Sequence, residues 1–229
     1  MDWAKDIFPF ENRDAPTRHV RRLWRAPSSQ KPKMISVASP LWGLVFEQKS
    51  SGAISAFLHG PETSATTVDI PKNAEYFGIE FDLGSFMPCL QMAKLADSSL
   101  VLPVQSNRTF LLFGETVELP TFDNADVFAN RLVRTGLLVG DMTVEQALLR
   151  QPVALTDRTI QRRFMAATGM TYATIRQLDR ATRAADMLEL GTSILDVVEN
   201  EGYSDQAHLT RSVKKYLGKT PGEILPSGC

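Results

Sequence analysis

The chain has 229 residues, of which 43% are hydrophobic and 22% charged, and its formal net charge is −1. Its length allows two domains with cores of their own, and its two cysteines, Cys89 and Cys229, exclude a disulfide framework or a cysteine metal cluster. Neither a membrane-spanning apolar run nor the hydrophobic core of a signal peptide is present, so we expect a protein of the cytoplasm.

The first 23 residues mix charges with Pro9 and Pro16 and are predicted to form a partly ordered arm, residues 1–23. A basic cluster lies within and just after it: Arg18, His19, Arg21, Arg22 and Arg25. A solvated segment is the favoured interpretation of this cluster, and a contact with DNA or a partner is the alternative.

From Met34 to Asp82 the pattern changes to short β-like runs, at residues 35–39, 41–48, 53–60, 66–70 and 76–82. Turn-forming glycine, proline, serine and asparagine separate these runs, which indicates an antiparallel sandwich or barrel. Alternation within the second run places three apolar side chains on one face of a strand: Trp42, Leu44 and Phe46.

Aromatic side chains of these runs are candidates for the lining of an effector pocket: Trp42, Phe46, Phe57, Tyr76 and Phe81. Core packing is the favoured interpretation for each one singly. The three histidines are His19, His59 and His208, and none has a second histidine at the spacing of a metal site. The sequence also lacks a G-x-S-x-G nucleophile motif, a phosphate-binding loop and a paired Cys–His motif. We therefore expect that the protein is not an enzyme and that it has no metal, cofactor or catalytic residue.

Residues 86–100 are predicted to be helical and then to continue into loops. Residues 121–140 are predicted to form a connecting and dimerisation segment, with a helix that Asp123 or Asn124 caps. The apolar stripe of this helix consists of Val127, Leu132 and Leu138. Residues 144–149 are then predicted to form the scaffold helix of a first helical unit.

Residues 156–169 predict a helix that Thr156 and Asp157 cap and that Gly169 ends. Its inner face is apolar and consists of Ile160, Phe164 and Ala167. Its outer face is polar and basic and consists of Arg158, Gln161 and Arg162.

A second unit follows the same plan. A helix at residues 194–201 stops at Gly202, and Ser204 is the predicted N-cap of a helix that runs from Asp205 to Leu217. The inner face of this last helix is formed by Leu209, Val213, Tyr216 and Leu217, and the outer face by Ala207, Arg211, Lys214 and Lys215. A short helix, a turn with glycine and a second helix with a basic face are typical of a unit that enters the DNA major groove.

One long helix is predicted between the two units, up to a stop at Gly191. About 19 residues make a rod of roughly 28 Å. Such a rod would hold two helices in successive major-groove segments, which are about 34 Å apart. From Asp141 onward 11 Lys/Arg oppose 11 Asp/Glu, so we expect the outer helix faces, rather than the total charge, to attract DNA.

The segments TDRTIQRRFMAATGMT and SILDVVENEGYSDQAHLTRSVKKYLGKTPGEI resemble the DNA-binding domain of AraC/XylS-type transcriptional regulators. The resemblance implies a tandem helix-turn-helix domain in which both second helices contact bases. By position it assigns base contacts to Arg158, Gln161, Arg162, Gln206, Ala207, His208 and Arg211. Phosphate contacts are assigned to residues that lie later on the helix or at its flank, namely Thr210, Lys214 and Lys215.

Many regulators of this type carry a cupin-like barrel before the DNA-binding domain, and FDLGSF, residues 81–86, is similar to the end of one. We therefore expect an α+β protein, with a cupin-like antiparallel β-barrel or sandwich at residues 24–120 and an all-helical domain at residues 141–229. Double-stranded operator DNA is the expected partner; a small-molecule effector, RNA polymerase and a second copy of the chain are further candidates. Two alternatives remain, a cupin-type metalloenzyme fused to a DNA-binding domain and a helical protein-interaction module without sequence-specific DNA binding.

Overall fold

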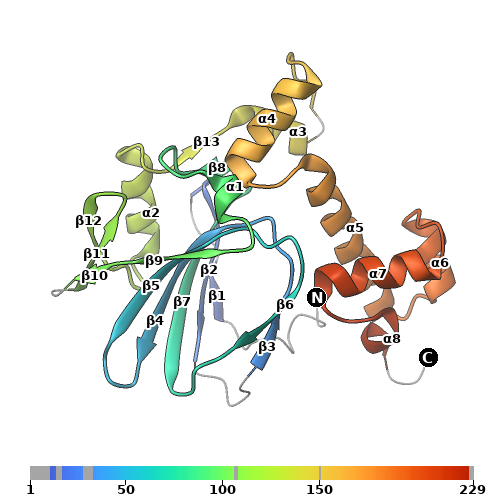
Figure 1. Cartoon of the computed structure of the whole chain (residues 1–229), viewed down its shortest axis with the longest axis horizontal. Helices are drawn as coiled ribbons and strands as arrows, with labels where there is room; N and C mark the ends of the chain where they lie inside the picture. Colours follow the sequence, from blue (N-terminus) through green and yellow to red (C-terminus); the bar gives the residue numbers. More distant parts are fainter. Residues whose placement is uncertain (1–10, 14–16, 28–32, 106–107, 150, 227–229) are drawn as a thin grey trace.

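A computed structural model of the chain describes all residues except 1–10, 14–16, 28–32, 106–107, 150 and 227–229. Most elements before residue 141 are antiparallel strands, and the rest of the described chain is helical, which confirms the predicted α+β class (Figure 1). The described residues between 11 and 140 are called the β-domain below.

The β-domain is built on a six-stranded antiparallel sheet with the order β1-β2-β7-β4-β5-β9. Its strands are β1 (Glu11–Arg13), β2 (Val20–Ala26), β4 (Gly43–Lys49), β5 (Ile54–His59), β7 (Ala74–Phe81) and β9 (Ser99–Leu102). The smaller sheets pair β3 (Lys33–Ser36) with β6 (Thr66–Asp69), β8 (Ser85–Phe86) with β13 (Val139–Gly140), and β11 (Thr109–Leu112) with both β10 (Val104–Gln105) and β12 (Glu115–Glu118).

One face of the six-stranded sheet is buried in the core of the β-domain. Alternate strand residues such as Leu44, Leu58 and Ile79 are fully buried there, and each contributes roughly 1.5–3 kcal/mol of transfer free energy. Phe110 of β11 and Phe128 of helix α2 (Ala125–Arg134) belong to the same apolar cluster. The helix and the three-stranded sheet therefore close this core.

The sheet begins earlier than the sequence predicted. Strands β1 and β2 include described residues of the expected arm, because Val20 and Leu23 are buried against the sheet; residues 1–10 and 14–16 lie outside the described residues. Two side chains of the basic cluster form ion pairs, which a solvated segment was not expected to do. The Arg22 guanidinium lies 2.8 Å from the Glu80 carboxylate, and Arg25 lies 2.6 Å from Glu11.

The helix predicted at residues 86–100 is wrong apart from one turn, α1 (Met92–Leu95). The end of that segment is strand β9, which pairs with β5, and the loops predicted after it form β10, β11 and β12. Pairing with strands that are distant in sequence decides these conformations, and a local pattern does not contain that information.

Helix α2 exists, but its predicted stripe is partly wrong. Val127 is 66% exposed, Leu138 lies beyond the end of the helix, and of the three predicted positions only Leu132 is a buried residue of the helix. The Asn124 side chain accepts a hydrogen bond from the Thr121 N–H and does not cap the helix. Because α2 packs into the β-domain core, it belongs to that core; its parts in connecting the domains and in dimerisation stay predictions.

The helical region contains α3 (Met142–Leu148), α4 (Asp157–Thr168), α5 (Tyr172–Glu189), α6 (Ile194–Asn200), α7 (Gln206–Leu217) and α8 (Pro221–Ile224). Two separate apolar clusters hold it together. One joins α3, α4 and the start of α5, and the other joins α5, α6, α7 and α8. Helix α5 is shared by both clusters and connects them as a single rod (Figure 1).

Gly78 provides a test of the β-domain packing. It lies in β7 opposite Trp24 of β2, and the indole ring covers the position that a β-carbon would occupy. We expect Gly78→Ala to lower the free energy of unfolding by about 1–3 kcal/mol, because the ring must shift in filled surroundings. Urea unfolding measures the change, with Gly222→Ala in α8 as the control, since a methyl group there meets open space. Equal stability of the two variants would contradict the prediction.

Candidate DNA interface

The ends of α3 and α4 follow from capping side chains. The Asp141 carboxylate accepts hydrogen bonds from the N–H groups of Thr143 and Val144 at the start of α3. The Thr156 hydroxyl accepts one from the Thr159 N–H (3.4 Å), and Gly169 ends α4 with a φ of 71°. A φ in this range favours glycine. Both predicted signals for α4 are therefore confirmed.

Helix α4 turns its apolar side inward and its charged side outward. Phe164 and Ala167 are buried against α3, and Ile160 is half-buried beside them. The three predicted base contacts of this helix are all exposed: Arg158, Gln161 and Arg162. Arg163 differs from them, because its guanidinium lies 3.2 Å from the Asp141 carboxylate and holds α4 to α3.

An open groove of about 1040 Å³ runs beside the outer side of α4. Residues of the preceding turn, of α4 and of the first turns of α5 line it. Arg158, Arg162 and Arg176 are among them, and Asp157 is the one acidic residue of the described lining. The groove is therefore positively charged, as a surface that meets phosphates must be.

The start of α7 differs in detail from the prediction. Asp205, not Ser204, is the N-cap, since its carboxylate accepts a hydrogen bond from the His208 N–H at 2.6 Å. This hydrogen bond, followed by the one from the Ser204 hydroxyl and by the charge of Arg211, holds the pKa of Asp205 below its ordinary value. The helix ends as predicted at Gly218, with a φ of 73°. The predicted N-cap, Ser204, therefore lies one residue before the observed one.

The faces of α7 are those that the periodicity predicted. Leu209, Val213, Tyr216 and Leu217 are buried. The exposed residues are Gln206, Ala207, Arg211, Lys214 and Lys215, while Thr210 and His208 are half-buried. The His208 ring packs on Tyr203, and its Nδ1 lies 3.2 Å from the Ser204 hydroxyl, so its Nε2 is the atom left for another partner.

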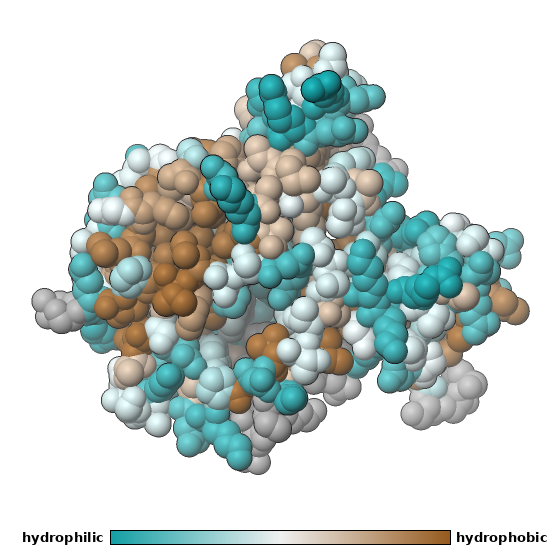
Figure 2. Space-filling view, in the orientation of Figure 1, coloured by the Kyte–Doolittle hydropathy of each residue, from teal (hydrophilic) through white to brown (hydrophobic). Residues whose placement is uncertain are grey.

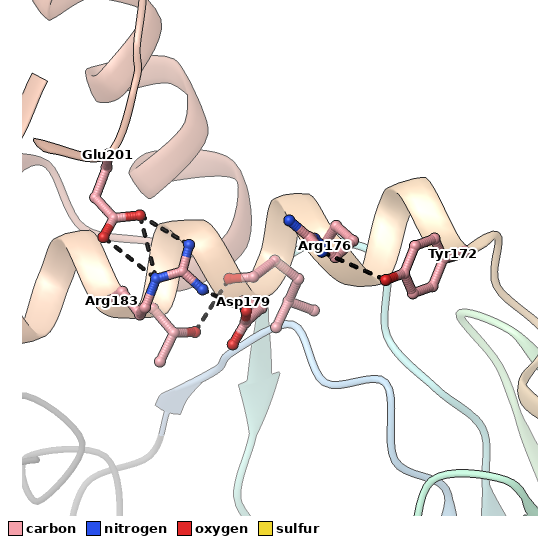
Figure 3. Close-up of polar contacts among 7 residues, drawn as sticks. Tyr172, Arg176, Asp179, Arg183 and Glu201 are labelled. Carbon is pink, nitrogen blue, oxygen red and sulfur yellow. Dashed lines mark hydrogen bonds and ion pairs between the residues drawn. The ribbon is translucent and has the colours of Figure 1, made fainter. Parts of the chain in front are cut away.

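Helix α5 has 18 residues and is therefore about 27 Å long. Figure 3 shows that ion pairs fix its far end to α6: the Arg183 guanidinium donates to Glu201 at 2.8 Å and to Asp179 within the same helix. These carboxylates raise the pKa of Arg183 above its ordinary value, and the hydrogen bonds that Glu201 accepts from it are the largest cause. The Tyr216 hydroxyl of α7 also donates to the Gln177 side chain at 3.0 Å. The second unit is thus attached firmly to the rod.

The β-domain touches the end of α7. The backbone N–H groups of Ala38 and Ala65 donate to the carbonyls of Tyr216 and Lys215 at 2.8 and 2.7 Å. These carbonyls belong to the last turn of α7, which has no further residues of its own to pair with them. The chain just after β3 and just before β6 therefore supplies donors to a helix that is expected to contact DNA.

The β-domain also touches the first unit, because Gly169 at the end of α4 lies against the backbone of Met92 in α1. Leu83 and Phe86 of the β-domain pack on the apolar cluster of α3 and α4. Both helical units are thus in contact with the β-domain (Figure 1).

The five candidate effector-pocket residues divide between the two faces of the six-stranded sheet. Trp42, Phe46 and Phe81 are buried in the β-domain core, with the rings of Trp42 and Phe81 4.3 Å apart. Core packing is thereby confirmed for these three. Phe57 and Tyr76 are half-buried and lie in register with Val45 and Glu47, on the opposite face.

On this second face, the Tyr76 hydroxyl lies 3.2 Å from the carboxylate of Glu47. Burial, followed by this carboxylate, raises the pKa of Tyr76 to about 12, so the phenol stays protonated. Met34 of β3 and Tyr76 both pack on the small cluster of Ala26 and Ile70, which places β3 beside this face.

We expect His19 to make the stability of the β-domain depend on pH. It is buried, its Nδ1 lies 3.0 Å from the Ser85 hydroxyl, and burial followed by the charge of Arg18 holds its pKa below 6.5. The imidazole of His19 binds its proton more tightly in the unfolded chain than in the folded one. The contribution of neutral His19 to the free energy of unfolding is therefore fully present above about pH 6.5 and decreases as the pH falls. Urea unfolding at about pH 7.5 and 5.5 should show a smaller decrease for His19→Gln, which cannot titrate. Equal decreases would contradict this.

Among the described residues, no three His, Cys, Asp or Glu side chains are grouped so that they could hold a metal ion. None of the described helices has the length and apolar character needed to cross a membrane.

Several residues of the groove were not predicted as contacts from the sequence, among them Tyr172 and Arg176 at the start of α5. Their spacing of four places them on one side of a helix, a signal that was present. What the sequence did not contain is that this side of α5 adjoins the outer side of α4.

A family model described as a helix-turn-helix domain matches residues 151–226. The HTH-type transcriptional regulator RipA of Corynebacterium diphtheriae is 39% identical over 70 residues, which are 31% of this chain and 21% of that protein. The match thus spans about a fifth of the length of that relative. Two solved structures of ToxT from Vibrio cholerae align at 10% and 9% identity, with TM-scores of 0.39 and 0.38. They cover 95% and 90% of this chain and 99% and 97% of those chains.

Proposed function

We propose, from the helix-turn-helix domain of the AraC type that residues 151–226 form, that this protein regulates transcription by binding a specific operator in double-stranded DNA. One observation supports this above all. Helices α4 and α7 each expose an arginine-bearing face, and a single helix of about 27 Å connects their units. Two such faces can enter neighbouring major-groove segments, which are about 34 Å apart.

The proposed roles of the side chains follow from their chemistry and position. Base contacts are assigned to Arg158, Gln161 and Arg162 on α4 and to Gln206, Ala207, His208 and Arg211 on α7. Arginine can donate two hydrogen bonds to guanine, glutamine can pair with adenine, and the alanine methyl group can touch a thymine methyl group. Phosphate contacts are assigned to Thr210, Lys214 and Lys215.

An effector is proposed to bind the β-domain on the second face of the six-stranded sheet, near Phe57 and Tyr76. The other three aromatic candidates are packed in the core and have no free face to offer. Strand β3 borders this face through Met34, and the chain beside β3 and β6 is bonded to α7. A ligand that displaced β3 and β6 would change the position of α7, which makes DNA binding dependent on the ligand.

Selection of genomic DNA fragments in vitro tests the regulator proposal, with the wild-type protein beside an Arg162→Ala, Arg211→Ala double variant. We expect the wild type to enrich a discrete site that spans two groove segments and the double variant not to enrich it. Binding that is weak at every salt concentration and indifferent to sequence would instead favour a protein-interaction module. A stoichiometric metal in the purified protein would favour the fused metalloenzyme.

The cell compartment and the remaining partners belong to the same proposal. We place this regulator in the cytoplasm, with RNA polymerase as a partner. In a dimer, the second copy of the chain would bind a second operator site on the DNA. Light scattering of the protein with and without operator DNA tests the dimer.

A further inference from the structure

Arg176 shares the groove beside α4 with the arginines that are proposed to contact bases. The groove lining includes Arg158 and Arg162 from α4 and Arg176 from the second turn of α5. Residues from two helices thus present guanidinium groups to one open space. Figure 2 shows hydrophilic side chains gathered over α4 and α7, in contrast to the hydrophobic area over β5 and β9.

The surroundings of Arg176 distinguish it from Arg183, seven residues later on the same helix (Figure 3). Two carboxylates, from Asp179 and Glu201, take up the guanidinium of Arg183, so its charge is neutralised within the fold. The guanidinium of Arg176 donates to the Tyr172 hydroxyl at 3.3 Å and lies 5.8 Å from the centre of that ring. Among the described residues, no carboxylate forms an ion pair with Arg176, which is exposed.

Tyr172 is itself held in place. Its ring packs edge-on against the buried Phe164 at 5.1 Å, so the support of Arg176 is anchored in the apolar cluster of the first unit. A cation held against an aromatic ring loses less conformational freedom when it binds a partner. Arg176 is therefore a positioned, uncompensated cation beside α4.

We propose that Arg176 binds a phosphate of the DNA strand that borders the major groove entered by α4. This inference rests on the proposed function. A helix with its side chains is about 10–12 Å wide, and the major groove is about 12 Å wide. A side chain that projects beside the inserted helix consequently meets the sugar-phosphate backbone and not the base edges. The chemistry needed there is a fixed positive charge with several donors, which a guanidinium supplies.

Salt titration of DNA binding tests this assignment. The measurement is the dissociation constant of the full chain for its selected site and for an unrelated duplex, between about 50 and 200 mM salt. Arg176→Gln is compared with Arg134→Gln, which removes the same charge from an exposed position of α2. Arg176→Lys is the conservative variant. One lost phosphate contact should reduce the salt slope by about 0.9. The ratio of the Arg176→Gln dissociation constant to that of the wild type should therefore fall about 3.5-fold over this range.

We expect Arg176→Gln to weaken binding to both duplexes by the same factor, and Arg176→Lys and Arg134→Gln to keep the wild-type slope. An unchanged slope and affinity in Arg176→Gln, with wild-type binding intact, would overturn the proposal and leave the proposed function standing. Weaker binding to the selected site alone would also overturn it, because Arg176 would then contact a base. If the wild-type protein itself binds neither duplex, the proposed function has failed.

Discussion

Replacing Phe164 by alanine is expected to lower the free energy of unfolding of the first helical unit by about 3–5 kcal/mol. Phe164 is fully buried at the centre of the cluster that joins α3, α4 and the start of α5, and its ring contacts Tyr172. This cluster is separate from those of the six-stranded sheet and of α6 and α7, so the loss should open the first unit locally while the sheet and α7 stay folded. Hydrogen exchange measured by peptide should show lost protection mainly at residues 157–168 and in the segments of α3 and α5 that pack on them, with α7 unchanged.

Leu195→Ala serves as the matched control, because Leu195 is 72% exposed on α6 and its removal should change stability by less than about 0.5 kcal/mol. If the backbone amides of α4 exchanged as slowly in Phe164→Ala as in this control, the neighbouring side chains would have filled the cavity that the lost ring leaves. If the whole chain lost protection together, the two units and the β-domain would unfold as one body. In either case the local character of the expected opening would be disproved.

Arg211→Ala is expected to weaken binding to the selected operator by about 1–3 kcal/mol and to relax the preference at one base position. Arg211 is exposed on the outer face of α7, and its neighbours Leu209 and Val213 fix the helix to the core. A guanidinium in the major groove can donate two parallel hydrogen bonds to guanine, which alanine cannot replace. Competition binding against operators with each base changed in turn measures the relaxation.

Lys214→Ala is the comparison for this prediction, since Lys214 lies one turn further along α7 and is assigned to a phosphate. It should weaken binding to every operator variant alike and reduce the salt slope by about 0.9. A uniform loss in Arg211→Ala would instead make Arg211 a phosphate contact. Retention of full affinity would remove α7 from the interface.

Local signals were sufficient for the helical half of the molecule. Thr156 and Gly169 bound α4, Gly218 ends α7, and the buried positions of α7 are those of the 3.6-residue period. Such signals work because caps and periodic faces involve residues at most four positions apart. Two errors there are small: Ser204 for Asp205 is a displacement by a single residue, and α3 spans Met142–Leu148 where residues 144–149 were predicted.

Tertiary structure decided what depends on residues that are far apart in sequence. Strands β9 to β12 and the strand at Val20–Ala26 exist because of their partners, and Val127 is exposed because α2 presents Phe128 to the core instead. Pairing also separated the aromatic candidates, placing Phe46 in the core and Tyr76 on the opposite face. The sequence alone thus determined the two helical units and their outward arginines. The contacts of Ala38 and Ala65 with α7, and the shared groove of Arg162 and Arg176, arose only when distant segments packed together.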